Sequence, residues 1–130
     1  MREILFRGKQ LHTNNWVFGD LFQWKHFNGK SFQKQFAINA QGFGTGQSLI
    51  IPETIGQYTG LKDKNGKMIF EGDLFTIGAE KETFEVVYES GCFLAYCNGK
   101  QYGLLGELMM CFVEIIGNIH DNPELITNPK

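Results

Sequence analysis

The residues that could do metal or acid–base chemistry in this chain are few and scattered. Its three histidines are His12, His26 and His120. None of them has the HxH, HxxxH or HExxH spacing of metal ligands, and a hydrolytic metal needs three or four converging ligands. Two acidic pairs, Glu71/Asp73 and Glu80/Glu82, lie near predicted turns, where carboxylates are usually only solvated. We therefore expect no metal site and no cofactor.

Nucleophilic catalysis has equally little support. The chain has no GxSxG motif, and no histidine lies near any of its three cysteines, Cys92, Cys97 and Cys111. The cysteine count is odd and there is no CxxC. Cys92 and Cys97 would face opposite sides of one strand, which keeps them from pairing. We expect three buried free thiols, as in a reducing cytoplasm, and no enzymatic activity.

A glycine-rich segment, Gly42–Gly46 (GFGTG), invites comparison with a phosphate-binding loop. It lacks the Gly-Lys-Ser/Thr of a P-loop and the GxxG spacing that opens a dinucleotide-binding helix. No strand–helix–strand pattern surrounds it. Residues 39–48 are therefore expected to form a flexible loop.

The most informative constellation is a predicted hairpin around Asn28-Gly29. A two-residue turn there would pair Phe27 with Lys30, Lys25 with Phe32, Gln23 with Lys34 and Leu21 with Phe36. Cross-strand pairs share one face of a ribbon, so aromatic and cationic groups would alternate there. The candidate binding residues are those of this face: Lys25, Phe27, Lys30, Phe32, Lys34 and Phe36.

Three interpretations of this face remain open. The aromatic rings can pack into the protein core while the lysine stems extend past them. They can instead be buried against another subunit. They can also stack on the bases of a single-stranded nucleic acid while the ammonium groups meet its phosphates.

The charge of the chain is divided unevenly along its length. Residues 1–50 hold six basic and two acidic residues, a net charge of +4, whereas residues 51–130 hold six basic and twelve acidic, a net charge of −6. The asymmetry suits an anionic partner of the first half, or contact between oppositely charged halves or subunits. The overall charge of −2 weakens the nucleic-acid interpretation, because a global basic field is missing.

Turn signals and β-branched residues predict a mainly β chain of 130 residues. Asn-Gly occurs at 28–29, 65–66 and 98–99, and Ser90-Gly91 is a fourth turn. In the second half we expect strands at 73–78, 84–89, 92–97, 100–104 and 111–119, with a helical turn within 103–110. This order is typical of a small SH3-like barrel. The prediction is an N-terminal β-hairpin region (residues 1–50) and a C-terminal SH3-like domain (residues 51–130).

Three segments resemble a known family. They are REILFRG with the following WVFGDL (2–21), IPETIGQYTGLKDKNGKMIFEGDLF (51–75) and VEIIGNIHDNPEL (113–125). Together they are similar to the YopX family of bacteriophage and prophage proteins, over a little under half of the chain. The resemblance implies a small phage or prophage protein with an SH3-like C-terminal domain. It implies no activity, substrate or catalytic residue.

Most of the middle segment has a structural explanation. Pro52 favours extended backbone at Ile51, Asn65-Gly66 closes a hairpin, and Leu74 or Phe75 points inward from a strand after Gly72-Asp73. A functional interpretation would instead place Glu53, Gln57 and Tyr58 on a binding surface.

These observations favour a non-catalytic module that binds a host or phage protein or assembles with itself. Nucleic-acid binding through the basic, aromatic hairpin is the alternative. The longest apolar run is the six residues of 108–113, far short of the about 20 that span a membrane, so no membrane association is expected. The N-terminus lacks the apolar segment of a secretory signal, which favours the cytoplasm of a bacterial host cell.

Overall fold

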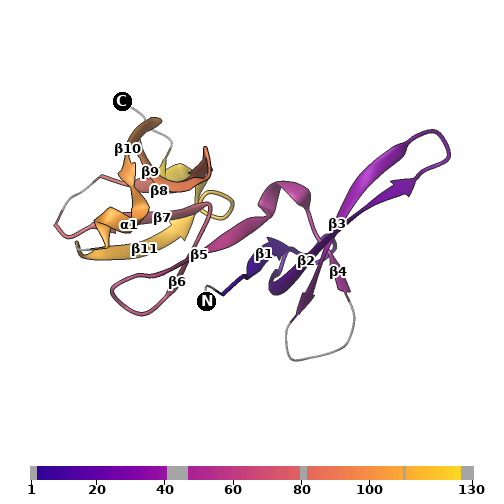
Figure 1. Ribbon diagram of the computed structural model, residues 1–130, viewed down its shortest axis with the longest axis horizontal. Coiled ribbons are helices and arrows are strands. Elements are labelled where there is room, and N and C mark those ends of the chain that lie inside the picture. Colours follow the sequence, from indigo (N-terminus) through magenta and orange to yellow (C-terminus); the bar gives the residue numbers. More distant parts are fainter. Residues whose placement is uncertain (1–2, 41–46, 80–81, 110, 127–130) are drawn as a thin grey trace. The chain divides into compact units, whose positions relative to one another are not determined.

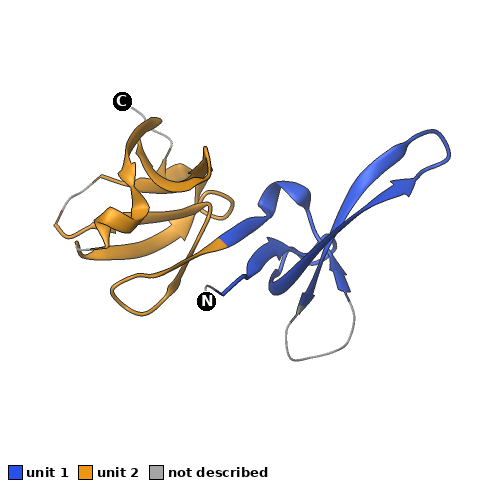
Figure 2. Cartoon of the chain, in the orientation of Figure 1, with its two compact units in different colours: residues 1–57 blue, residues 58–130 orange. Residues whose placement is uncertain are grey.

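In the computed structural model, the described residues are 3–40, 47–79, 82–109 and 111–126. They form two antiparallel sheets with little helix, which confirms the mainly β prediction (Figure 1). The chain makes two compact units, residues 1–57 (unit 1) and 58–130 (unit 2) (Figure 2). A compact unit need not fold alone, so the predicted domain division after residue 50 stays a prediction.

Unit 1 is a sheet of antiparallel strands in the order β4-β3-β2-β1-β5. Its strands are β1 (Phe6–Lys9), β2 (Trp16–Phe27), β3 (Phe32–Ala40), β4 (Gln47–Leu49) and the start of β5 (Gly56–Lys62). Ile38 and Ile50 are buried, and Gly8 packs so closely on them that an added Cβ would lie 2.5 Å from Ile50 Cγ2. A short 3₁₀ turn, Pro52–Thr54, follows Ile51, whose ψ of 114° confirms the expected extended backbone.

Unit 2 contains a five-stranded antiparallel sheet in the order β10-β9-β8-β7-β11. Its elements are β6 (Met68–Phe70), β7 (Asp73–Ile77), β8 (Phe84–Glu89), β9 (Cys92–Cys97), β10 (Lys100–Leu104), α1 (Leu105–Leu108), β11 (Val113–Asn118) and the 3₁₀ turn η2 (Pro123–Leu125). From Tyr58 on, β5 pairs with β6 in this unit. Residues from five strands and α1 form its core: Ile69, Phe75, Ile77, Phe84, Val86, Ala95, Leu105 and Val113.

The tight turns of unit 2 follow the sequence closely. The predicted strands 84–89, 92–97 and 100–104 are β8, β9 and β10 with unchanged bounds. Ser90-Gly91 joins the first two, with φ values of 55° and 80°, and Asn98-Gly99 joins the last two, with 55° and 78°. Positive φ at both positions is the signature of a type I′ turn, so both two-residue turns are confirmed.

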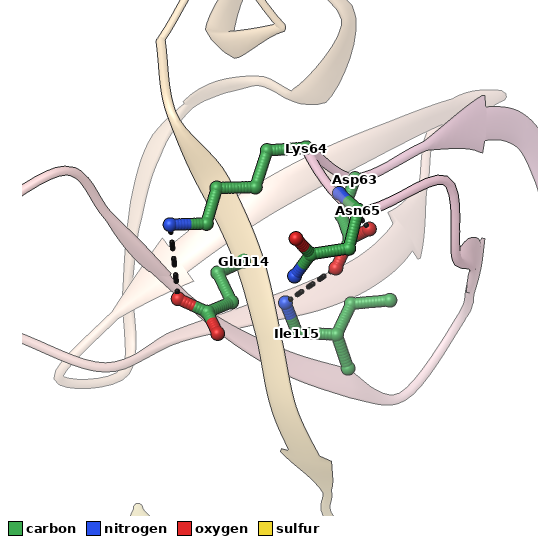
Figure 3. A network of polar contacts seen from close by, with 5 residues as sticks. All are labelled: Asp63, Lys64, Asn65, Glu114 and Ile115. Atoms are coloured by element: carbon green, nitrogen blue, oxygen red, sulfur yellow. Dashed lines mark hydrogen bonds and ion pairs between the residues drawn. The ribbon is translucent and has the colours of Figure 1, made fainter.

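The loop between β5 and β6 is anchored by one carboxylate (Figure 3). Asp63 Oδ1 accepts hydrogen bonds from the backbone N–H of Asn65 and of Lys67, each at 2.9 Å. Its Oδ2 accepts from Ile115 N in β11, at 3.0 Å, across 52 positions of sequence. Beside it, Lys64 Nζ lies 3.3 Å from Glu114 Oε1, in an exposed ion pair. Asp63, within the family-like segment 51–75, thus connects the β5–β6 loop to β11 in unit 2.

Two predictions need comment at this level. The sheet of unit 2 is open over the described residues, since its edge strands β10 and β11 do not pair with each other; closure into an SH3-like barrel therefore stays a prediction. The expected loop 39–48 is shorter than predicted, because β3 extends to Ala40 and β4 begins at Gln47. The whole glycine-rich segment Gly42–Gly46 lies outside the described residues.

Candidate functional site

The predicted hairpin exists, but its predicted register was wrong. Phe27 lies opposite Phe32, Lys25 opposite Lys34 and Gln23 opposite Phe36. The turn therefore spans four residues, Asn28–Ser31, instead of two. Asn28 is the physical reason, because its Oδ1 accepts from Lys30 N at 2.9 Å and from Ser31 N at 3.0 Å. An Asn side chain that satisfies loop N–H groups stabilises this wider turn.

The shift of two positions preserves which residues share a face. Opposed residues lie on the same side, so Lys25, Phe27, Phe32 and Lys34 still share one surface, which we call the lysine face. Phe36, one row further, shares it as predicted. Lys30 leaves it, because it lies in the turn and faces no strand residue; its predicted pairing with Phe27 was wrong.

The hairpin extends beyond the rest of its sheet. β1 pairs with β2 only at Trp16–Gly19, and β4 pairs with β3 only at 37–39. Residues 22–35, here called the distal hairpin, are therefore a two-stranded ribbon, visible in Figure 1 as the part of β2 and β3 that continues past both neighbours. A ribbon of this kind has no core of its own and leaves both strand edges unpaired.

The aromatic rings at the hairpin tip are not core residues of the described structure. Phe27 is 53% exposed and Phe32 is 68% exposed, while their ring centroids lie 5.1 Å apart. Only Phe36, nearer the sheet, is partly buried. The interpretation that this face packs into the core is therefore wrong for Phe27 and Phe32. Contact with a second subunit and contact with a nucleic acid both remain.

The two lysines of the lysine face lie directly across from each other. Lys25 and Lys34 are both exposed, and neither makes an ion pair with another described residue. Like charges in opposed positions destabilise a strand pair. The hairpin therefore carries a small local cost that an anionic group on a partner would relieve.

The opposite face of β2 carries two pairs of aromatic residues separated by Asp20, which were not predicted to lie on one surface. Phe22 and Trp24 follow Trp16 and Phe18 on the same side of the strand, at the period of two that a strand dictates. All but Trp16 count among the exposed large apolar side chains. Aromatic residues at positions 16, 18, 22 and 24, with Asp20 between the two pairs, are the signal that could have revealed this surface.

Two cations lie against the near end of this surface. The Arg7 guanidinium lies 4.6 Å from the centroid of the Trp16 ring, and Lys9 Nζ lies 5.5 Å from it. Both contacts are within the range of cation–π attraction. They fix Trp16 at the base of the hairpin, where β1 pairs with β2.

The other proposed binding surface receives less support. Tyr58 is buried at 5% exposure and packs on Phe70, with ring centroids 5.5 Å apart. Tyr58 is therefore a structural residue and does not contribute to a binding surface with Glu53 and Gln57. Glu53 is exposed and Gln57 is partly buried.

The cysteines differ from the expectation of burial, since Cys92 and Cys111 are exposed and only Cys97 is partly buried. Burial raises the pKa of the Cys97 thiol, and the neighbouring Glu82 carboxylate raises it further. A raised pKa opposes formation of the nucleophilic thiolate. In the part of the chain that the structure describes, no three His, Cys, Asp or Glu side chains are grouped as metal ligands would be. That part also contains no helix long and apolar enough to cross a membrane.

Comparison with known proteins places the chain in a family. The model of the YopX protein family matches residues 5–127, nearly the whole sequence. The chain belongs to the YopX family. A crystal structure of protein EF1440 from Enterococcus faecalis is similar to this YopX-family chain with a TM-score of 0.51 and 22% sequence identity, over 97% of this chain and 99% of that one. At that identity the likeness concerns the fold alone. A search of curated proteins gave no match for this member of the family.

Proposed function

We propose that this YopX-family chain is a non-catalytic binding module that uses the distal hairpin to contact protein, in the first place other copies of itself. The observation that carries the proposal is the exposure of large aromatic side chains on both faces of the hairpin. Phe27 and Phe32 occupy one face, and Phe22 and Trp24 the other. Contiguous exposed apolar surface is typical of protein interaction sites.

Exposure on two faces distinguishes the candidate partners. Single-stranded nucleic acid lies along one face of a sheet, where bases stack on rings. A protein partner can cover both sides of a ribbon. Protein contact therefore accounts for Phe22 and Trp24 as well as for Phe27 and Phe32.

The cellular setting belongs to the same proposal. The family resemblance supports a phage or prophage accessory protein that acts in the cytoplasm of the bacterial host. It also supports an SH3-like description of unit 2, in which β7 to β11 would correspond to the barrel strands. This description concerns the scaffold, and folds of this kind host many functions.

The test is the mass of the particle in solution. We expect sedimentation velocity to give wild-type species heavier than the 14.8 kDa monomer, with a population that grows with concentration. Phe27→Ser with Phe32→Ser should weaken association at least about tenfold, since aromatic anchors dominate interface energies. The matched control is Phe112→Ser, which removes an equally exposed ring, 71% against 68% for Phe32, from unit 2.

Each outcome of this test decides the proposal. Loss of mass in the hairpin variant, together with retention in the Phe112→Ser control, supports self-assembly through the hairpin. A wild-type chain that stays at 14.8 kDa up to about 0.5 mM, or a hairpin variant that associates like the wild type, contradicts it. Far-ultraviolet circular dichroism verifies that each variant remains folded.

Nucleic-acid binding is the second candidate, and the Lys25–Lys34 pair favours it specifically. A single-stranded backbone and its bases would meet two exposed rings and two ammonium groups that make no ion pair with a described residue. The acidic balance of residues 51–130 works against it.

Fluorescence anisotropy with labelled single-stranded DNA, RNA and duplex DNA, at two salt concentrations, tests this candidate. If it is right, Lys25→Ala with Lys34→Ala weakens binding and reduces its salt dependence. The absence of binding at low salt removes the candidate.

A further inference from the structure

We propose that the lysine face of the hairpin docks on a carboxylate-bearing face of unit 2 in a second copy of the chain. The inference rests on the proposed self-assembly and names the two surfaces that meet. It goes beyond that proposal because the acceptor surface lies in the other unit, at strands β8 and β9.

The acceptor surface is the side of the five-stranded sheet that faces away from its core. Phe84, Val86 and Ala95 point into the core, so the residues between them in β8 and β9 point to the other side. This second side carries two carboxylates and an apolar row across three strands. We call it the carboxylate face: Glu85, Val87, Glu89, Leu94, Tyr96 and Leu104.

The carboxylate face has an apolar row between two acidic ones. Val87, which is partly buried, pairs with Leu94, and Leu94, which is only 5% exposed, pairs with Leu104 in β10, which is 42% exposed. Glu85 lies two residues before Val87 in β8, and Glu89 lies two residues after it. Rows two residues apart in a strand are separated by about 6.6 Å.

The lysine face has the complementary order at the same spacing. Its row of Phe27 and Phe32 lies two residues from its row of Lys25 and Lys34, so these rows too are about 6.6 Å apart. When the aromatic row covers the apolar row of Val87, the lysine row falls over one of the carboxylate rows. The Tyr96 hydroxyl, from the row of Glu85, donates to Glu89 on the far side of the apolar row, so the hairpin rings would meet the Tyr96 side chain together with Val87 and Leu104.

The charge distribution decides which surface of a second copy the hairpin can meet. Residues 21–50 contain Lys25, Lys30 and Lys34 and no acidic residue, so two hairpins placed together repel each other. Residues 58–130 hold eleven acidic and six basic residues. Complementary potentials of this kind steer and orient protein association.

Among the described residues, neither Glu85 nor Glu89 has a cation as its partner. Glu85 is partly buried and makes no ion pair with any described residue, and Glu89 accepts a hydrogen bond from the Tyr96 hydroxyl. Burial raises the pKa of the Glu85 carboxyl, so its charged form is poorly solvated. An ammonium group from a second copy would supply the missing counter-charge. It would also relieve the repulsion between Lys25 and Lys34.

Complementary charge reversal tests this pairing. One variant carries Lys25→Glu and Lys34→Glu, and the other carries Glu85→Lys and Glu89→Lys. Each alone places like charges across the contact, so we expect each to weaken self-association at least tenfold in sedimentation equilibrium. In an equimolar mixture every contact between the two variants regains opposite charges. Association in the mixture should return to within about threefold of the wild type.

Two controls keep the result interpretable. Lys62→Glu with Lys100→Glu changes the net charge equally at exposed lysines outside both surfaces, and should leave association unchanged. Glu85 is partly buried, so Glu89→Lys alone, at an exposed position, serves as the second acceptor variant if the double variant fails to fold.

The outcomes separate this inference from the proposed function. If Phe27→Ser with Phe32→Ser abolishes association but both charge reversals leave it intact, the acceptor surface is wrong and hairpin-mediated assembly stands. If each reversal weakens association but their mixture does not recover, the two surfaces do not meet each other. A wild-type chain that never associates overturns both proposals together.

Discussion

Two loops of this chain are stabilised by the same kind of side-chain hydrogen bond but have different roles. In the hairpin loop, Asn28 Oδ1 accepts the backbone N–H of Lys30 and Ser31. In the β5–β6 loop, Asp63 Oδ1 accepts the backbone N–H of Asn65 and Lys67. Both loops contain an Asn-Gly pair, and in both one side-chain oxygen replaces the hydrogen bonds that a tighter turn would make.

The difference lies in the second oxygen. Asp63 Oδ2 reaches Ile115 in β11, so its loop is tied to the sheet of unit 2. Asn28 has an amide in place of that oxygen, and the rings next to its loop are exposed. One loop is a structural anchor and the other presents side chains to a partner. The two loops thus share the same local hydrogen bonding, although one stabilises unit 2 and the other positions exposed side chains for binding.

Replacement of Asp63 gives the largest expected effect. Asp63→Ala removes three hydrogen bonds to a charged acceptor, each worth about 1.5–3 kcal/mol, although water can reach the exposed loop amides. We expect a loss of about 3 kcal/mol in the free energy of unfolding, or about 10 °C in Tm. Urea unfolding followed by circular dichroism measures it. A loss below about 1 kcal/mol would mean that the loop is no anchor.

The same carboxylate makes unit 2 sensitive to acid. Burial raises the pKa of Asp63, but the hydrogen bonds from Ile115, Lys67 and Asn65 outweigh it and hold that pKa below its ordinary value. Since the folded pKa lies below the unfolded one, the stabilisation is complete above the unfolded pKa. It is lost as the pH falls through the folded pKa.

The expected signature is a difference that shrinks in acid. Wild type should be more stable than Asp63→Asn at pH 7, and the gap between their urea midpoints should narrow from about pH 5 downwards. Asp63→Asn keeps the side-chain size and one acceptor oxygen, so it isolates the charge. If the difference in urea midpoint between wild type and Asp63→Asn stays constant down to pH 2.5, the charge of Asp63 does not contribute to stability.

The corresponding change in the hairpin loop should have a smaller effect. Asn28→Ala removes two hydrogen bonds from a neutral acceptor in an exposed loop, for which about 1 kcal/mol is expected by analogy with helix caps. The loss should be confined to the distal hairpin, which pairs with no further strand of the described residues. Amide hydrogen exchange should show faster exchange at residues 22–35 and unchanged rates in β8 and β9. Equal effects in both units would show that the hairpin is coupled to the rest of the chain.

These two loops also show what the sequence could and could not predict. The strands β8, β9 and β10 were predicted with their bounds because Ser90-Gly91 and Asn98-Gly99 satisfy a local rule, positive φ at both turn positions. The rule failed at Asn28-Gly29, where the Asn28 side chain favours a wider turn. The error shifted the register by two positions, which keeps each side chain on its predicted face, so five of the six candidate residues still share a face and only Lys30 leaves it.

Features that depend on residues far apart in the chain could not be predicted from the sequence. No local pattern links Asp63 to Ile115, 52 positions away, and the exposure of Phe27 and Phe32 depends on where the neighbouring strands β1 and β4 end. Alternation of aromatic and cationic residues predicts a shared face. It does not predict whether that face meets a core, a subunit or solvent, because burial is a property of the whole fold.

The smallest expected effect is a stabilisation, opposite in sign to the effects predicted for Asp63 and Asn28. In the anchored loop the Asp63 carboxylate accepts three backbone hydrogen bonds and Lys64 lies beside Glu114, whereas the hairpin holds Lys25 against Lys34. Lys25→Gln should stabilise the isolated hairpin by about 0.3 kcal/mol, seen as slower amide exchange at residues 22–35 in dilute, monomeric protein. Added salt should slow amide exchange in the wild type but hardly in Lys25→Gln, since salt screens the same repulsion.

The Lys25→Gln variant should nevertheless bind its partner less well than the wild type. A substitution that improves folding and impairs association marks a residue kept for binding, whereas unchanged exchange and unchanged salt dependence would show that the two ammonium groups avoid each other in solution.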